Sequence, residues 1–133
     1  ELLAGQMALA LVRSRMKRSA GTAWVGDGRL QSAVRKAFPY PLTGAQERSV
    51  SEILADMAQP ERMLRMLQGD VGSGKTIVAL LSCCAAIEAG GHAAILAPTA
   101  LLAPHHLATI TPLAQAACIE IAILSRRRHG NTP

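Results

Sequence analysis

The sequence predicts an α/β fold of about three parallel strands with flanking helices, preceded by a helical segment. Two observations carry this prediction. In the second half of the chain, short apolar runs typical of buried strands alternate with longer runs that have the length of helices. A glycine-rich loop follows the first of these apolar runs and leads into a helix. Strands that alternate with helices in this way pair in parallel through right-handed crossovers, with the helices on the faces of the sheet.

The composition is that of one globular domain. Of the 133 residues, 50% are hydrophobic but only 2% are aromatic, so small aliphatic side chains must form the core. The net charge of +5 favours polyanions, of which nucleic acid is the commonest, although a solvated basic surface explains it equally well. Cys83, Cys84 and Cys118 fit neither a disulfide framework nor a zinc site, which indicates a reduced cytoplasmic compartment. We find no signal peptide and no membrane span, and expect no contact with a membrane.

We divide the chain into a helical linker segment, residues 1–40, and a second region, residues 41–133. In the linker, apolar residues recur at helical spacing from Leu2 to Leu11. Cations follow them, as the helix dipole favours at a C-terminus. A second, short helix is predicted over 30–38, because Pro39 prevents its continuation.

The second region opens with a helix that begins at Thr43, where the spacing T-x-x-Q is typical of a capping box. Gly90 and Gly91 close the helix after the glycine-rich loop, and Pro112 is expected to kink or end the last helix. The strands are predicted over 63–68, 93–97 and 119–124, and the intervening helices over 75–89 and about 99–117.

The glycine-rich loop matches G-x-x-x-x-G-K-S/T in full. Glycines permit the tight turns that aim backbone N–H groups at phosphate oxygens, and the N-terminus of the next helix adds free N–H groups and its dipole. Lys75 would place its ammonium between the outer phosphates of a nucleoside triphosphate, and Thr76 would offer its hydroxyl to Mg²⁺. The predicted site consists of Gly69, Asp70, Val71, Gly72, Ser73, Gly74, Lys75 and Thr76.

Two further segments narrow the class of nucleotide-binding protein: Pro41–Gln46, which reads PLTGAQ, and Ile95–Ala103, which reads ILAPTALLA. With the loop, they resemble the RecG-type ATP-dependent DNA helicases of superfamily 2, and the resemblance extends over nearly the whole chain. It implies the first part of a RecA-like, ATP-binding helicase domain. It also implies a monomer that uses ATP and Mg²⁺ to act on branched DNA in recombination and repair. The transcription-repair coupling translocase, which shares this layout, is the alternative.

The resemblance also implies roles for single residues. Gln46 would read adenine, Lys75 and Thr76 would be the catalytic residues at the phosphates and Mg²⁺, and Pro98 and Thr99 would lie against the DNA backbone. Two of these positions have a structural alternative. Gln46 can serve only as the partner in the capping box, and Thr99 only as the N-cap of the next helix.

Hydrolysis needs an acidic pair that holds Mg²⁺ and orients the attacking water. No acid in the chain ends a predicted strand; the candidates are Glu47, Glu52, Asp56, Glu61, Glu88 and Glu120. We therefore expect a fragment that is inactive alone, with the acidic pair and a second motor lobe beyond Pro133. The alternative is a truncated or decayed product without catalytic function. A small-molecule kinase would need a lid and a substrate pocket, for which we find no residues.

Overall fold

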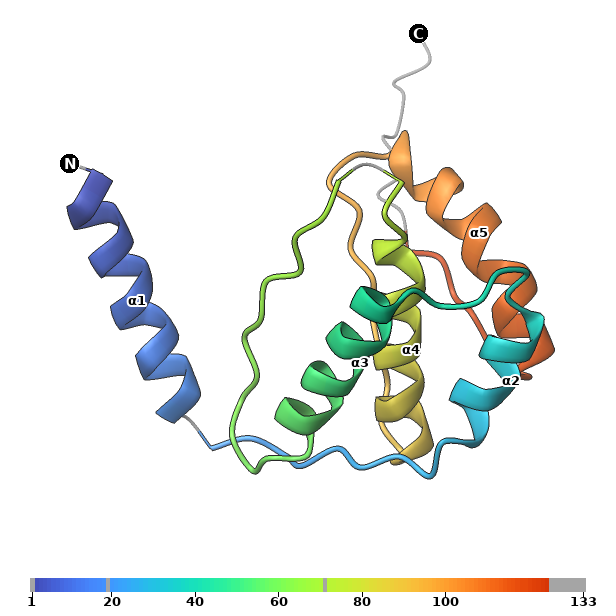
Figure 1. Cartoon of the computed structure of the whole chain (residues 1–133), viewed down its shortest axis with the longest axis horizontal. Helices are drawn as coiled ribbons and strands as arrows, with labels where there is room; N and C mark the ends of the chain where they lie inside the picture. Colours follow the sequence, from blue (N-terminus) through green and yellow to red (C-terminus); the bar gives the residue numbers. More distant parts are fainter. Residues whose placement is uncertain (1, 19, 71, 125–133) are drawn as a thin grey trace, which may run out of the picture.

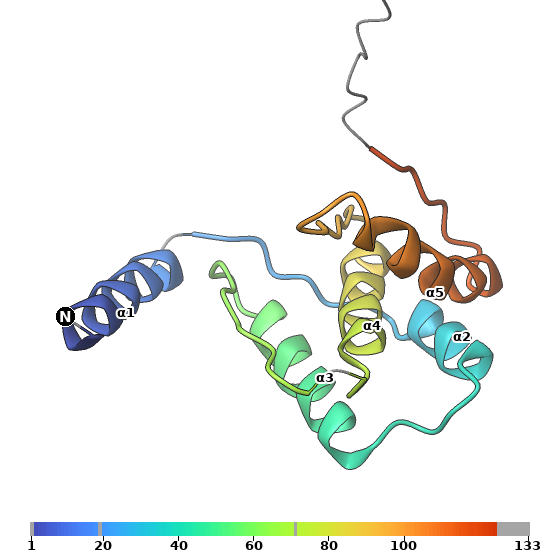
Figure 2. The same ribbon diagram turned by 90° about the horizontal axis from the view of Figure 1, so that it is seen from above.

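The computed structural model describes residues 2–18, 20–70 and 72–124 (Figure 1). Within these ranges the chain forms five helices: α1 (Leu2–Arg18), α2 (Arg29–Ala37), α3 (Gly44–Met57), α4 (Lys75–Glu88) and α5 (Leu102–Ala116). Helix α4 is central, because it packs against α2, α3 and α5, while α2 also packs against α5 (Figure 2). Helix α1 stands apart from this group (Figure 1). None of the described helices is both long enough and apolar enough to cross a membrane.

Helices α2, α3 and α4 confirm the predictions made from local signals. Helix α3 begins with a complete capping box. The Thr43 hydroxyl accepts a hydrogen bond from the Gln46 backbone N–H at 3.2 Å, and Gln46 Oε1 accepts one from the Thr43 N–H at 2.8 Å. Helix α4 begins at Lys75, directly after the glycine-rich loop, and is followed by Gly90 with a φ of 91°.

The core lies around α4. This helix has no charged residue between Lys75 and Glu88, its first and last positions, and such a helix is stable only when it is buried on most sides. Leu81 and Cys84 of α4 are fully buried, together with Val34 of α2. The complete set of buried apolar residues is Val34, Val50, Ile53, Met57, Ile77, Val78, Leu80, Leu81, Cys84, Ala85, Ile110, Leu113, Ala114 and Ala117.

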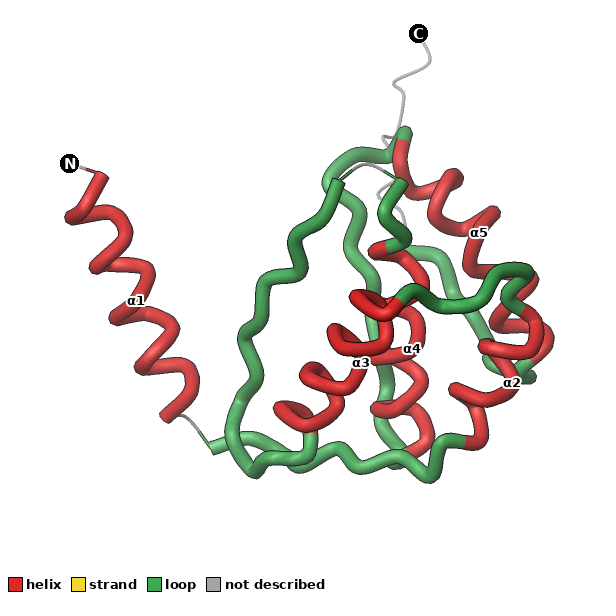
Figure 3. Tube along the Cα trace, in the orientation of Figure 1, coloured by secondary structure: helices red, strands yellow, loops and turns green. Residues whose placement is uncertain are grey.

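The three segments predicted as strands differ from the prediction. They run as irregular chain, and the described residues contain no strand (Figure 3). A strand is stable only when its backbone N–H and C=O groups pair with a neighbour, and no such bonds join these segments to one another. Most of their apolar side chains remain exposed, as at Leu96 (95%) and Leu124 (97%), while Leu67 and Ile119 pack partly buried against the core. The α/β prediction therefore holds for the helices, while the parallel sheet stays a prediction.

Helix α5 also corrects the sequence analysis. It begins at Leu102, and its N-cap is Leu101 without a side-chain hydrogen bond, so the interpretation of Thr99 as the N-cap was wrong. Thr99 contributes only its carbonyl oxygen, which accepts a hydrogen bond from the Leu102 N–H at 3.2 Å. The helix continues through Pro112, because Ile110 and Leu113 on either side of this residue are buried in the core.

Residues 20–28 cross the C-terminal ends of α3 and α4, at the bottom of the molecule in Figure 1. The N–H of Gly21 donates to the carbonyl of Pro60 at 2.9 Å, and the N–H of Trp24 donates to the carbonyl of Met57 at 2.7 Å. The N–H of Gly28 donates to the carboxylate of Glu88 at 2.6 Å. These bonds attach the linker to the end of α4 that lies opposite the glycine-rich loop.

Candidate functional site

The glycine-rich loop turns sharply into α4. Gly72 has a φ of 82° and Gly74 a φ of 81°, in the left-handed region that favours glycine. A Cβ at Gly74 would also collide with the side-chain amide nitrogen of Gln46. Within the loop, the N–H of Ser73 donates to the carbonyl of Asp70 at 3.0 Å. The predicted site residue Val71 lies outside the described residues.

The N-terminus of α4 has the features of an anion site. Its N-cap, Gly74, offers no side chain, and the first turn contains no acidic residue. The first backbone N–H groups of a helix have no partner within the helix, and together with the dipole they attract a phosphate. Thr76 lies half-buried in this first turn.

Lys75 is exposed and its side chain folds back over the loop. Its ammonium donates to the carbonyl oxygen of Gly69 and, at 3.4 Å, to that of Asp70. Among the described residues, no carboxylate pairs with this ammonium. The positive charge is therefore held at the loop by neutral carbonyl groups, where an incoming phosphate would be its first anionic partner.

Gln46 joins α3 to the loop. While its Oε1 completes the capping box, its Nε2 donates to the carbonyl of Ser73 at 3.1 Å and to that of Gly74 at 3.5 Å. The capping box expected from the sequence is thus present, while adenine reading by Gln46 stays a prediction. The structure also brings Gln46 next to the phosphate loop, although 27 residues separate it from Ser73.

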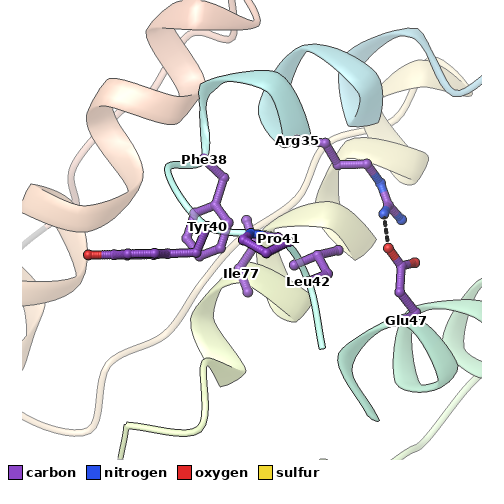
Figure 4. Close-up of a pocket in the computed structure, with 7 residues that line it drawn as sticks. All are labelled: Arg35, Phe38, Tyr40, Pro41, Leu42, Glu47 and Ile77. Carbon is purple, nitrogen blue, oxygen red and sulfur yellow. Dashed lines mark hydrogen bonds and ion pairs between the residues drawn. The ribbon is translucent and has the colours of Figure 1, made fainter. Parts of the chain in front are cut away.

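A pocket of about 220 Å³ lies beside Glu47, the residue that follows Gln46 in α3 (Figure 4). It is lined by Arg35, Phe38, Tyr40, Pro41, Leu42, Glu47 and Ile77. The chain has one phenylalanine and one tyrosine, and both line this pocket, with ring centroids 5.9 Å apart and ring planes at 79°. On the other side, Arg35 and Glu47 form an ion pair at 2.5 Å. An aromatic and aliphatic wall with a few polar groups is typical of a site for a flat organic ring.

The sequence analysis missed this pocket. Its position could have been found from Phe38-Pro39-Tyr40, because these aromatic residues stand directly before the Pro41–Gln46 segment in a chain that is almost free of aromatics. Ile77, which follows Lys75 by two positions in α4, connects the pocket to the phosphate loop.

The predicted DNA-contacting residues lie elsewhere. Pro98 and Thr99 are exposed in the bend that precedes α5, and no hydrogen bond joins either of them to the described residues of the loop. Their exposure leaves both free to contact a large partner.

Several of the candidate acids form contacts away from the loop. Glu52 and Asp56 both pair with Arg65 at 2.8 Å, and the hydrogen bond from Arg65 to Asp56 raises the pKa of that guanidinium. Glu47 pairs with Arg35. Among the residues that the structure describes, no group of three or more His, Cys, Asp or Glu could hold a metal ion.

Comparison with known proteins confirms the resemblance seen in the sequence. The family model of the DEAD/DEAH box helicases matches residues 43–131. The chain is 47% identical over 95 residues to the ATP-dependent DNA helicase RecG of Bacillus subtilis, which covers 71% of this chain and 14% of that protein. It is 38% identical over 130 residues to the RecG helicase of Escherichia coli K12, covering 98% of this chain and 19% of that protein.

A chloroplast and mitochondrial RecG homologue of Arabidopsis thaliana is 52% identical over 77 residues, which cover 58% of this chain and 8% of that protein. The chain thus spans less than a fifth of the length of these relatives. No solved structure matches the chain. Because the family match covers more than half of its residues, including the loop and α3 to α5, the chain belongs to the DEAD/DEAH box helicase family.

Proposed function

We propose that this chain is the ATP-binding part of an ATP-dependent DNA helicase that acts on branched DNA in recombination and repair. The observation that carries the proposal is the loop before α4, where the left-handed glycines, the uncapped helix N-terminus and the Lys75 ammonium converge on one point. The names of the relatives supply the reaction, since they are ATP-dependent DNA helicases.

In this proposal the loop from Gly69 to Thr76, with Asp70, Val71, Gly72, Ser73 and Gly74 between them, surrounds the phosphates. Lys75 neutralises the outer two phosphates, and Thr76 provides one ligand to Mg²⁺. Mg²⁺ would supply positive charge at the phosphoryl group that is transferred.

The base of the nucleotide would occupy the pocket beside Glu47. The distance from the loop is suitable, because Gln46 contacts Ser73 and Ile77 lines the pocket within the first turn of α4. The two aromatic rings offer a face for stacking, and adenine can accept or donate hydrogen bonds at the Gln46 amide if that amide turns away from Ser73. A hydrogen bond between the Gln46 amide and adenine would therefore replace the bond from Gln46 Nε2 to the carbonyl of Ser73.

Contact with DNA is assigned to the exposed Pro98 and Thr99, supported by the net charge of +5. We further propose a monomer in the reduced cytoplasm, which agrees with three free cysteines in the described part of the chain. In the longer protein, segments 63–68, 93–97 and 119–124 would be strands of a RecA-like sheet. Hydrolysis would depend on an acidic pair outside these residues, because no acid of the chain ends a predicted strand.

The test is Lys75→Ala in the full-length protein, with Lys36→Ala as the matched control. Lys36 is also exposed at a helix surface but lies on α2, away from the loop. We expect DNA-dependent ATP hydrolysis to fall at least about 100-fold for Lys75→Ala, because one lost group that stabilises the transition state has this effect. The melting temperature and the activity of the control should not change. Normal hydrolysis by Lys75→Ala, or loss of its fold, would refute the phosphate assignment.

A further inference from the structure

Glu88, the last residue of α4, forms a dense set of contacts that the nucleotide site does not explain. Its Oε2 accepts hydrogen bonds from the Gly28 N–H at 2.6 Å and from the Gln31 side-chain amide at 3.3 Å. Its Oε1 accepts one from the Gln31 N–H at 2.9 Å. The residues that donate are 57 and 60 positions away in the sequence.

These contacts add to the cap at the N-terminus of α2, where the Asp27 carboxylate accepts a hydrogen bond from the Arg29 N–H at 3.0 Å. The N-cap of α2 is Gly28, with a φ of 82° and no side chain to accept a hydrogen bond. The first N–H groups of a helix need an acceptor, and a negative charge is favoured there by the dipole. A carboxylate from α4 fills both requirements. A Cβ at Gly26 would collide with Oε2 of Glu88, so the chain before α2 leaves room for this carboxylate.

The two ends of α2 are thus fixed to two different helices. At its N-terminus, Glu88 binds it to α4. Toward its C-terminus, Arg35 pairs with Glu47 of α3 at 2.5 Å, and this ion pair is one wall of the pocket. The chain leaves α2 directly into Phe38 and Tyr40, which form the aromatic wall.

These contacts connect α4, α2 and α3 into a continuous path that begins and ends at the phosphate loop. Helix α4 begins at the phosphate loop and ends at Glu88, Glu88 holds α2, and α2 carries one side of the pocket. From there Glu47 leads to Gln46, which donates to the carbonyl of Ser73 in the loop. Every step is a hydrogen bond, an ion pair or a continuous helix.

From this arrangement we infer that Glu88 is a positioning residue for the nucleotide base. It fixes α2 along α4, and thereby sets the place of the aromatic pocket relative to the phosphate loop. The inference rests on the proposed function, because it needs a nucleotide whose base lies in the pocket and whose phosphates lie in the loop. Glu88 itself touches neither part.

The experiment compares two probes, ATP–Mg²⁺ and tripolyphosphate–Mg²⁺, by calorimetry on the full-length protein. Tripolyphosphate reports on the loop alone, whereas ATP reports on the loop and the pocket. Glu88→Gln keeps the shape of the side chain but places an NH₂ group against an N–H donor. We expect it to weaken ATP binding about fivefold, as for a lost helix cap, and to leave tripolyphosphate binding unchanged. Glu120→Gln is the matched control, since Glu120 is exposed and its side chain forms no hydrogen bond with the part of the chain that the structure describes.

A second arm tests whether Glu88 acts through the pocket. In a Tyr40→Ala background one of the two rings of the aromatic wall is already lost, so Glu88→Gln should change ATP affinity less than twofold. Gly26→Ala offers an independent route, because its Cβ displaces the Glu88 carboxylate without removing the charge, and should give the same selective loss of ATP binding.

The outcomes distinguish a positioning role of Glu88 from a purely structural one. Equal weakening of both probes, an unchanged affinity for ATP, or the same loss in the Tyr40→Ala background would overturn the positioning role and leave Glu88 as a structural cap. Lys75→Ala, measured in parallel, must weaken both probes. If it weakens neither, the proposed nucleotide site fails, whatever Glu88→Gln does.

Discussion

The packed helices and the three irregular segments are equally rich in apolar side chains, yet they differ in burial. Leu81 of α4 is fully buried, whereas Leu96 in segment 93–97 is 95% exposed. A helix satisfies its backbone hydrogen bonds internally and needs only a neighbour for its apolar face. A strand needs a neighbour for its backbone as well. Helices α2 to α5 therefore pack against one another within the described residues. A sheet over the three segments would need backbone partners that the described residues do not provide.

The largest expected effect tests this comparison in the core. Leu81→Ala should destabilise the protein by about 3 kcal/mol, because it leaves a cavity among buried side chains. Leu96→Ala should change the stability of the 133-residue chain by less than about 0.5 kcal/mol, as for an exposed residue. Urea unfolding followed by circular dichroism measures both.

The same pair of variants sharpens the comparison in the full-length protein. If segment 93–97 becomes a buried strand there, Leu96→Ala should cost about 3 kcal/mol, as much as Leu81→Ala. If Leu96→Ala has no effect in either context, this segment does not belong to the proposed sheet.

A smaller effect concerns Gln46, which connects the packed region to the loop. Gln46→Ala should lower stability by about 1 kcal/mol through the lost capping box, and should also weaken the preference for ATP over GTP. Thr43→Ala is the matched control, since it removes the same cap but leaves the Gln46 amide in place. Equal ATP preference in the two variants would mean that Gln46 is only a cap partner. Thermal unfolding and competition binding supply the two measurements.

The smallest expected effect is a difference in reactivity between the buried Cys84 and the exposed Cys118. Burial, followed by the charges of Glu88 and Cys83, raises the pKa of the Cys84 thiol to about 12. Since the folded state disfavours the thiolate, the stabilisation is complete below the pKa of the unfolded thiol and is lost as the pH rises toward 12. At pH 8 we expect iodoacetamide to modify the exposed Cys118 and spare Cys84 until the chain unfolds, as mass spectrometry can show. Early modification of Cys84 would show that the core around α4 opens readily.

The parts of the fold that were predictable from sequence have local signals. The start of α3 follows from Thr43 and Gln46 three residues apart, and the start of α4 from the glycine-rich loop. The start of α5 has no such signal, because Leu101 offers no capping side chain. Pairing of strands is not local at all, so the apolar runs alone could not decide it.

The candidate site also has one part that was predictable from sequence and one that was not. The phosphate loop is contiguous in sequence, so its residues could be named from the motif. The pocket combines Arg35, Tyr40 and Ile77 from separate elements, and only their packing brings them together. Glu88 was considered only as a possible acid for hydrolysis, because nothing in the sequence shows that it meets a helix almost sixty positions earlier.

Residues 20–28 have a mechanical consequence. Because Gly21, Trp24 and Gly28 are bonded to the far ends of α3 and α4, a pull on α1 is transmitted to those ends before it reaches any other part of the molecule. Helix α4 has 14 residues and is roughly 21 Å long, and a rod of this length behaves as a lever. One helix thus joins the bonded end of the linker at Glu88 to the end that carries Lys75.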